Sequence, residues 1–233
     1  VNYGSFPFIT KYNNFTDDSK DYLQGIFDTI LNKDIARRLN IADTVSLENV
    51  TKFLLHSIGN KISPTKIANT LKSAGKSVDQ KTVDKYIKGL VDSMLIYEAG
   101  RYNIKGKQFL STQSKYYVVD VGMRNALVKS SESDIGHILE NIVYLELKRR
   151  YKNVYVGEID SGEVDFVSVN DNKYEYYQVS ATTLDENTLK RELAPFGKIK
   201  DNYPKYLLTL DDVFSNADYN GVQKINVLEW LLK

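Results

Sequence analysis

The sequence predicts an α+β protein of two domains, a mainly helical domain over residues 1–129 and an α/β domain over residues 130–233. Apolar residues recur at helical spacing through most of the first half. In the second half, short runs of β-branched and aromatic residues alternate with turn residues. Residues 130–134 are polar throughout and are the best candidate for a linker between the two domains.

Composition limits the classes of function. Among 233 residues, 42% are hydrophobic, and 31 basic against 30 acidic side chains give a net charge of +1. Any basic surface that attracts a polyanion must therefore be local. The absence of cysteine excludes disulfides, thiolate metal sites and cysteine nucleophiles, and it favours a cytoplasmic location. No apolar run is long enough to span a membrane, and the first residues lack signal-peptide features. Because the chain opens with Val1 on a Gly-Ser-Phe-Pro turn, we expect a fragment of a longer protein.

The first half predicts four helices followed by a hairpin. Asp18 or Ser19 can cap the first helix, and Ser63 followed by Pro64 is a typical start for the third. The hairpin is expected from two β-prone runs, 95–98 and 101–104, around a turn at Ala99-Gly100. Helix, turn, helix and hairpin is the winged-helix order. The expected helices cover residues 18–39 (one helix or a broken pair), 46–58, 64–73 and 79–94, and a strand at 115–121 and a short helix to 127 follow.

The fourth helix carries a basic stripe. Lys81, Lys85 and Lys88 share one face, and the apolar residues occupy another, as in a helix that packs on its domain and offers ammonium groups to phosphates. From Lys61 to Lys107 there are ten basic and four acidic residues, so this segment carries the positive charge of the chain. The predicted nucleic-acid contacts are Lys76, Lys81, Lys85, Lys88 and Arg101, directed at the DNA backbone with little sequence preference.

Two other interpretations apply to this region. A lysine stripe is often only a solvated face, and winged helices also serve as protein-docking modules, so a protein partner stays open as an alternative. Residues 70–77 end like a phosphate-binding loop, but Thr70 stands where the first glycine is required. The segment also joins two helices, whereas such a loop follows a strand. We therefore expect no ATP binding by this chain.

The second half predicts an α/β unit around one acidic helix residue. A helix over 134–151 is apolar almost all round and should be buried, yet it contains Glu140. His56 and His137 fall in different predicted domains, so we expect no metal or catalytic pair between them. The other expected elements are strands at 153–158, 163–169, 174–180 and 206–210, a helix at 185–201 and a final apolar run at 224–232.

The positions of four residues in this half indicate a candidate catalytic site. Glu140 lies on the predicted helix, Asp165 on one strand, and Gln178 and Ser180 two residues apart on the next strand. This layout resembles the PD-(D/E)XK nuclease fold, with its three-layer α/β architecture and mixed central sheet. In active members, three carboxylates hold a divalent metal and a lysine assists the attacking water. Taken singly, Glu140 could instead pair with Arg124 or Lys148.

The resemblance implies a degenerate site in this chain. Glu140 and Asp165 match the metal-binding carboxylates, whereas Gln178 replaces the third carboxylate and Ser180 replaces the lysine. The site loses one negative charge and its only cation, so we expect weak Mg²⁺ binding at most and no cleavage. The alternative is a divalent-metal-dependent DNA nuclease that uses Glu140 and Asp165.

Several segments together resemble a domain of unknown function that follows the ATPase core in bacterial and archaeal AAA-type ATPases. The most specific are Asp120-Val-Gly-Met-Arg124 and Gly136-His-Ile-Leu-Glu-Asn-Ile-Val-Tyr-Leu-Glu146. The resemblance covers almost the whole chain and implies an upstream ATPase domain, which would hold ATP and Mg²⁺, as the partner. We therefore expect a non-catalytic nucleic-acid-docking or regulatory module of such an ATPase.

Overall fold

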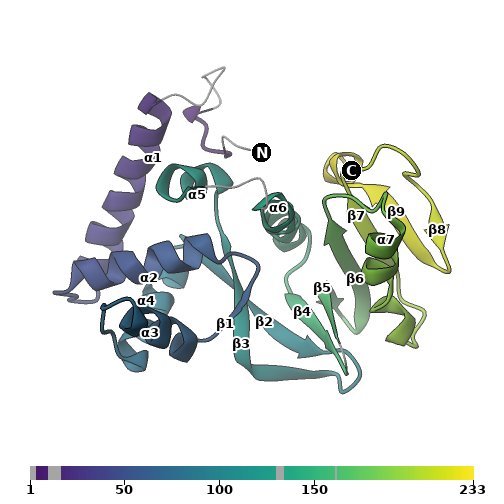
Figure 1. The fold of residues 1–233 in the computed structure, drawn as a ribbon, viewed down its shortest axis with the longest axis horizontal. Helices are drawn as coiled ribbons and strands as arrows, with labels where there is room; N and C mark the ends of the chain where they lie inside the picture. The colour runs from purple at the N-terminus through teal and green to yellow at the C-terminus, as the bar shows by residue number, and fades with distance from the viewer. Residues whose placement is uncertain (1–3, 10–16, 130–133, 161) are drawn as a thin grey trace. The chain divides into compact units, whose positions relative to one another are not determined.

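A computed structural model describes residues 4–9, 17–129, 134–160 and 162–233 (Figure 1). It contains α-helices and a large mixed sheet, as the sequence predicts. The chain divides into two compact units, Val1–Glu98 with Ser114–Glu132, and Ala99–Gln113 with Ser133–Lys233. Residues 130–133 of the predicted linker lie outside the described residues. None of the helices in the described ranges is long and apolar enough to cross a membrane.

Helices dominate the first unit. The predicted helix over 18–39 is a pair, because α1 continues directly into the wider π-helical segment η2. Leu23 and Phe27 of α1 and Val50 and Leu54 of α2 are among its buried core residues. The helices are α1 (Asp17–Thr29), η2 (Ile30–Arg37), α2 (Thr44–His56), α3 (Pro64–Ser73), α4 (Gln80–Asp92) and α5 (Val121–Leu127).

Local capping signals determine where several of these helices begin. Ser63 accepts a hydrogen bond from the backbone nitrogen of Lys66, with Pro64 in the first turn, which confirms the predicted start of α3. Asp79 caps α4 in the same way. The start of α2 is earlier than predicted, because Asp43 supplies the cap.

The hairpin is longer than the sequence suggests. The predicted turn at Ala99-Gly100 is wrong: both residues lie inside the continuous strand β2 (Ile96–Asn103). The chain turns instead before β3 (Gln108–Val118), where Lys107 adopts a positive φ of 48°. Ala99 is fully buried, so this glycine-containing pair continues the strand rather than facing solvent in a turn. In the first unit, β3 also pairs with the short strand β1 (Lys61–Ile62).

A mixed sheet forms the centre of the second unit. The end of β2, at residues 101–103, pairs with β4 in parallel. Strands β4, β5 and β6 pair with one another in antiparallel order. Strands β6, β7 and β9 pair in parallel. Strands β8 and β9 form a hairpin that the sequence did not predict, and the expected apolar run at 224–232 contains the end of β9 and the helix that follows it. The bounds are β4 (Val154–Ile159), β5 (Gly162–Asn170), β6 (Lys173–Ser180), β7 (Lys205–Thr209), β8 (Asp218–Tyr219) and β9 (Val222–Asn226).

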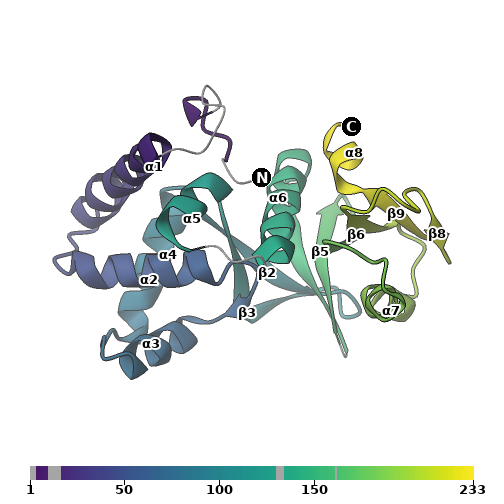
Figure 2. The same cartoon turned by 45° about the horizontal axis from the view of Figure 1, so that its top comes forward.

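Helices cover both faces of this sheet. Successive residues of a strand point to opposite faces. Tyr177 of β6 contacts Trp230 of α8 (Val227–Leu231), whereas its neighbour Gln178 contacts α7 (Glu186–Leu193). Helix α6 (Ile135–Arg150) lies against β4, β5 and β6 (Figure 2). The predicted helix over 185–201 is too long: α7 ends before Pro195, and a short 3-10 turn, η4 (Phe196–Lys198), follows.

Candidate functional site

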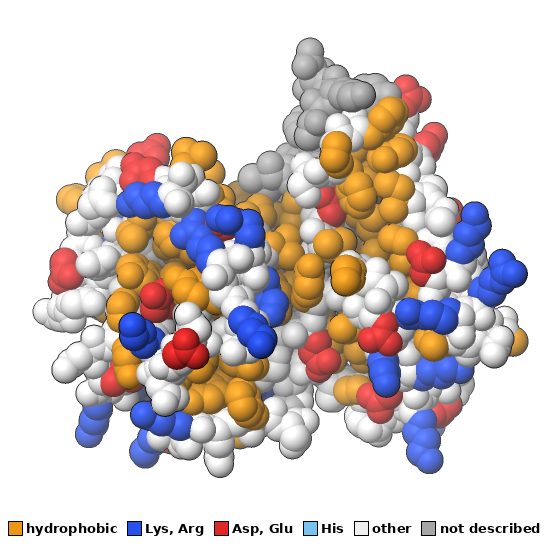
Figure 3. All heavy atoms as spheres, turned by 180° about the vertical axis from the view of Figure 1, so that it is seen from behind, with side chains coloured by type: hydrophobic (Ala, Val, Ile, Leu, Met, Phe, Trp, Pro, Cys, Tyr) orange, Lys and Arg blue, Asp and Glu red, His pale blue; other side chains and the backbone are white. Residues whose placement is uncertain are grey.

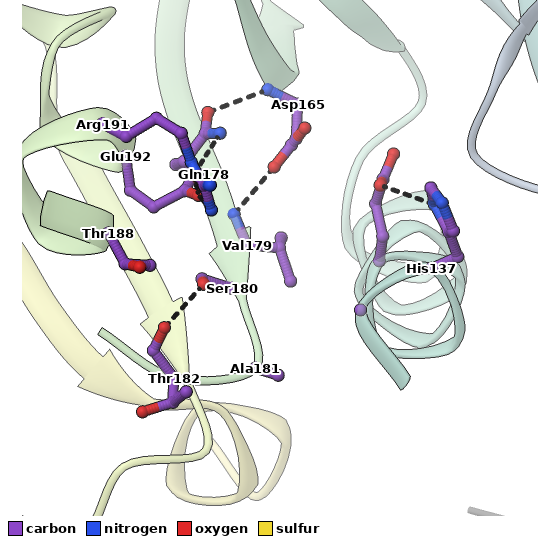
Figure 4. Close-up of a pocket in the computed structure, with 12 residues that line it drawn as sticks. His137, Asp165, Gln178, Val179, Ser180, Ala181, Thr182, Thr188, Arg191 and Glu192 are labelled. Carbon is purple, nitrogen blue, oxygen red and sulfur yellow. Dashed lines mark hydrogen bonds and ion pairs between the residues drawn. The ribbon is translucent and has the colours of Figure 1, made fainter. Parts of the chain in front are cut away.

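The four residues singled out from the sequence lie around one cavity of the second unit. Glu140, Asp165, Gln178 and Ser180 all line a cavity of about 450 Å³ (Figure 4). Their side chains come from α6, β5 and β6. The cavity is further lined by Gly136, His137, Val179, Ala181, Thr182, Thr188, Arg191 and Glu192.

Gln178 is fully engaged within the protein. Its amide nitrogen donates to Glu192 Oε2 at 2.8 Å, and its amide oxygen accepts from the backbone nitrogen of Asp165 at 3.3 Å (Figure 4). The side chain is 9% exposed. A buried amide is stable only when donors and acceptors are matched. Gln178 therefore joins β5 to α7 through both ends of its amide.

Asp165 and Ser180 also make contacts inside the protein. Asp165 Oδ2 accepts a hydrogen bond from the backbone nitrogen of Val179 at 2.9 Å, which ties its carboxylate to the neighbouring strand. Ser180 Oγ donates to the carbonyl oxygen of Thr182 at 2.9 Å. The hydroxyl group of Ser180 therefore stabilises the turn that follows β6.

The sequence did not predict two residues of the cavity, Glu192 and Arg191. Glu192 is buried, and Arg191 donates to its Oε1 from Nη2 at 2.8 Å and from Nε at 3.1 Å. Glu192 thus supplies a third carboxylate from α7, and Arg191 supplies a cation whose side chain is 72% exposed. Helical spacing could have indicated Glu192, because this residue lies three positions after the apolar Leu189 and directly before Leu193.

The three carboxylates of the cavity come from α6, β5 and α7. Among the described residues there is no group of three or more histidine, aspartate or glutamate side chains placed to hold a metal ion. Glu140 is buried on α6, and its Oε2 lies 3.9 Å from Nδ1 of His137.

A buried ion pair supports the loop that borders the cavity. Lys224 Nζ donates to Asp211 Oδ2 at 2.9 Å, and the same oxygen accepts from the backbone nitrogen of Thr183 at 2.9 Å. Burial alone would raise the pKa of Asp211, but hydrogen bonds from Thr182, Lys224 and Thr183 outweigh it and lower the pKa to about 2. This cluster holds the segment after β6, including Thr182, against the end of β7.

The basic residues predicted to contact nucleic acid separate into two groups. Lys81, Lys85 and Lys88 are exposed on α4, and Lys76 precedes that helix with its Nζ 2.7 Å from Asn49 Oδ1. Arg101 differs, because it lies on the part of β2 that belongs to the second unit and forms a bidentate pair with Glu158 at 2.7 and 3.1 Å. The four lysines, in contrast, all belong to the first unit.

The chain matches a protein family over more than half its length. Residues 1–134 match the family described as "Domain of unknown function (DUF8612)". The chain belongs to this family. The match covers the helical unit and ends where α6 is about to begin, so it does not describe the cavity of the second unit.

Curated relatives extend the similarity to nearly the whole chain. An "Uncharacterized protein" of Haemophilus influenzae is 37% identical over 231 residues, which are 99% of this chain and 56% of the relative. "Uncharacterized protein MJ1544" of Methanocaldococcus jannaschii is 32% identical over 97% of this chain and 50% of its own length. This DUF8612 chain thus spans about half the length of the curated relatives it matches.

A solved structure also aligns with the chain at low similarity. The crystal structure of protein VC1899 from Vibrio cholerae covers 97% of this chain and 55% of its own, at 10% identity and a TM-score of 0.27. A TM-score this low carries no information about function.

Proposed function

We propose that this chain is a nucleic-acid-docking module of an AAA-type ATPase, with a winged-helix unit that contacts the DNA backbone and a nuclease-like unit that does not cleave. One observation carries the proposal: α4 buries one face and presents lysines on another. Val83, Ile87 and Leu90 are at most 5% exposed, whereas Lys81 and Lys88 are exposed to solvent. A helix arranged in this way packs on its unit and leaves ammonium groups available for phosphates.

The connection before α4 adds to this surface. Lys72 at the end of α3 and Lys76 in the connection are both exposed. Asp79 and Asp84 lie among these lysines, and on the face shown in Figure 3 basic and acidic side chains are interspersed. We therefore expect weak binding that is not sequence-specific and that disappears as salt screens the charges.

Duplex binding tests this proposal directly. Fluorescence anisotropy with a labelled DNA duplex should show binding at low salt that weakens steeply at physiological salt. Replacing Lys81, Lys85 and Lys88 together by glutamine should abolish most of it. The matched control replaces Lys173, Lys190 and Lys200, three exposed lysines of the second unit, and should bind as the wild type does. No binding at low salt, or equal loss in both triple variants, would overturn the proposal.

The expectation that the second unit does not cleave rests on the contacts of Gln178 and Ser180. Hydrolysis of a phosphodiester needs a metal held by concentrated negative charge and a group that polarises the attacking water. Gln178 is neutral and bridges β5 to α7, and Ser180 donates to Thr182. Neither residue provides what an active nuclease has at these positions.

A metal-dependent nuclease is the second candidate, favoured by three carboxylates around one cavity. Glu140, Asp165 and Glu192 all line it. Incubation of supercoiled plasmid with Mg²⁺ or Mn²⁺ tests this activity, and Glu140→Gln and Asp165→Asn should each abolish any cleavage. Cleavage that persists in both variants would point to a contaminant or to other residues.

A protein-docking module is the third candidate, and a groove along α1 favours it. Tyr22, Gly25, Ile26 and Ile30 line a mainly apolar groove of about 420 Å³ in the first unit. A chain that fails to bind DNA but forms a stable complex with the remaining half of a full-length relative would support this function instead.

The ATPase context is open to a simple check. The relatives are about twice as long as the matched region, which leaves room for a further domain. The remaining half of the Haemophilus influenzae relative should contain a phosphate-binding loop between a strand and a helix. Absence of such a loop there would remove the ATPase from the proposal.

A further inference from the structure

A second cavity lies at the opposite end of the parallel strands of the second unit. It has a volume of about 500 Å³ and is bordered by Lys205 and Val222, the first residues of β7 and β9. The cavity around Glu140 instead borders Ser180, the last residue of β6. The two cavities therefore belong to different ends of the same sheet, and the function proposed above does not use this second one.

Strand register explains why the sheet is hollow here. Val222 pairs with Lys205 on one side and with Tyr219 on the other, so the three residues form a row across β7, β9 and β8. Residues directly opposite each other share a face of the sheet. Neighbouring strands are about 4.8 Å apart, which places Lys205 and Tyr219 on the order of 10 Å from each other. The short side chain of Val222 between two long ones leaves the space that forms the cavity.

Apolar side chains form part of the wall of this space, and Lys205, Asp218 and Asn220 add polar groups to it. Phe196 and Ile199, in the segment after α7, border the cavity and belong to the hydrophobic core of the unit together with Val222. A Cβ atom added at Gly197 would meet no atom within 4 Å, so the wall is open beside this residue. A ligand with both an apolar body and a polar group matches this mixed lining.

Lys205 provides a cation at one side. Its Nζ donates to the carbonyl oxygen of Asp201 at 2.8 Å but is 3.9 Å from the carboxylate of Asp201. That carboxylate accepts closer hydrogen bonds from the hydroxyl of Tyr176, at 2.6 Å, and from the backbone nitrogen of Tyr203, at 3.2 Å. The Lys205 side chain is 12% exposed. An ammonium has three donors, so a carboxylate in the cavity would gain a charge-assisted hydrogen bond from a partly desolvated group.

We propose that this cavity binds a small aromatic carboxylate. The ring lies over Val222 between Phe196 and Tyr219, and the carboxylate accepts from Lys205 Nζ. Lys205 disfavours a cationic ligand, and Asp218, which also lines the cavity, disfavours a second negative charge on the ligand. The site is therefore suited to a monoanion, and it is independent of the nucleic-acid surface of the first unit.

Isothermal titration of the whole chain with three matched probes tests this site. Hydrocinnamate should bind saturably with one site per chain, at least about tenfold more tightly than hydrocinnamyl alcohol, because only the acid can accept from Lys205. The amine phenethylamine should bind more weakly than the alcohol. Lys205→Met should weaken hydrocinnamate binding about tenfold and leave binding of the alcohol unchanged. The control Lys200→Met, at an exposed position outside the cavity, should behave as the wild type does.

A second variant keeps the proposal testable if Lys205→Met does not fold. Val222→Phe enlarges the side chain over which the ring is proposed to lie and should strongly weaken binding of both the acid and the alcohol, while circular dichroism shows an unchanged fold. The proposal is overturned if folded wild-type protein gives no saturable heat with hydrocinnamate. It is equally overturned if the acid and the alcohol bind alike, or if folded Val222→Phe binds hydrocinnamate as the wild type does.

Discussion

The lysines on α4 of the first unit and the charged residues of the second unit differ in what they contact. Within the described residues, Lys81, Lys85 and Lys88 are exposed and make no ion pair with the protein. In the second unit, Arg191 pairs with Glu192, and Lys224 pairs with Asp211. Charges that stay unpaired on a surface are available to a ligand, whereas paired and buried charges stabilise one conformation.

Polar residues of this protein therefore fall into two classes, those that contact other parts of the protein and those that face solvent. The cavity looks like a catalytic site by the position of its residues, yet Gln178 joins β5 to α7 and Ser180 stabilises the turn after β6. On α4, Lys81, Lys85 and Lys88 are exposed to solvent. Gln178 thus has a structural role, whereas ligand binding by the lysines is the proposal that the DNA-binding experiment tests. Four predictions test how far individual residues contribute to stability, and the largest expected effect concerns the buried ion pair.

Lys224→Met should destabilise the protein by about 3–5 kcal/mol, because it leaves the carboxylate of Asp211 buried without its cation. Urea unfolding followed by circular dichroism measures the loss. The control is Lys105→Met, which breaks an equally short pair with Asp160 at 2.8 Å on exposed side chains. That variant should lose less than about 1 kcal/mol. Equal losses in the two variants would show that burial of the pair is unimportant.

Acid should weaken the same cluster. A carboxyl group whose pKa is lower in the folded than in the unfolded state stabilises the fold fully above the unfolded value of about 3.9, and this stabilisation disappears as the pH falls toward the folded value. For Asp211, with a pKa of about 2, the expected loss between pH 5 and pH 2 is about 2 kcal/mol. Unfolding free energies measured across this range should show the slope. The slope should be smaller in Asp211→Asn, and an unchanged slope would contradict this role.

Gln178→Glu tests whether the amide is structural. The new carboxylate would face Glu192, which now accepts a 2.8 Å hydrogen bond from the Gln178 amide, so we expect a loss of about 1–2 kcal/mol. The double variant Gln178→Glu with Glu192→Gln exchanges the two groups and should recover part of the stability. Urea unfolding of both variants decides between them. A single variant as stable as the wild type would show that the hydrogen bond from residue 178 to Glu192 of α7 does not stabilise the fold.

Gly25→Ala should have the smallest effect and the opposite sign. Gly25 is an exposed residue inside α1, and a Cβ added there meets no atom within 4 Å. Because alanine favours a helix over glycine by about 0.8–1 kcal/mol, the variant should be more stable by up to that amount. Thermal unfolding measures the gain. A loss of stability would indicate that the groove along α1 is occupied by another part of the protein.

Local patterns in the sequence were sufficient to predict much of the fold. Ser63-Pro64 and Asp79 begin helices where the sequence predicts them, because a cap acts within three residues of itself. Alternation of β-branched and aromatic residues likewise located the strands over 153–158, 163–169 and 174–180. Local spacing placed Gln178 and Ser180 on one face of a strand, but grouping them with Glu140 and Asp165 depended on a resemblance to a known fold, and their role stays a prediction.

Only the tertiary structure determined which groups contact each other across the chain. Ala99-Gly100 has turn composition but lies inside β2, where Ala99 is buried. The Gln178–Glu192 hydrogen bond and the Lys224–Asp211 ion pair join residues 14 and 13 positions apart, on different elements. The spacing of residues along one element determines which of them share a face, but the partner of a buried polar group depends on how separate elements pack.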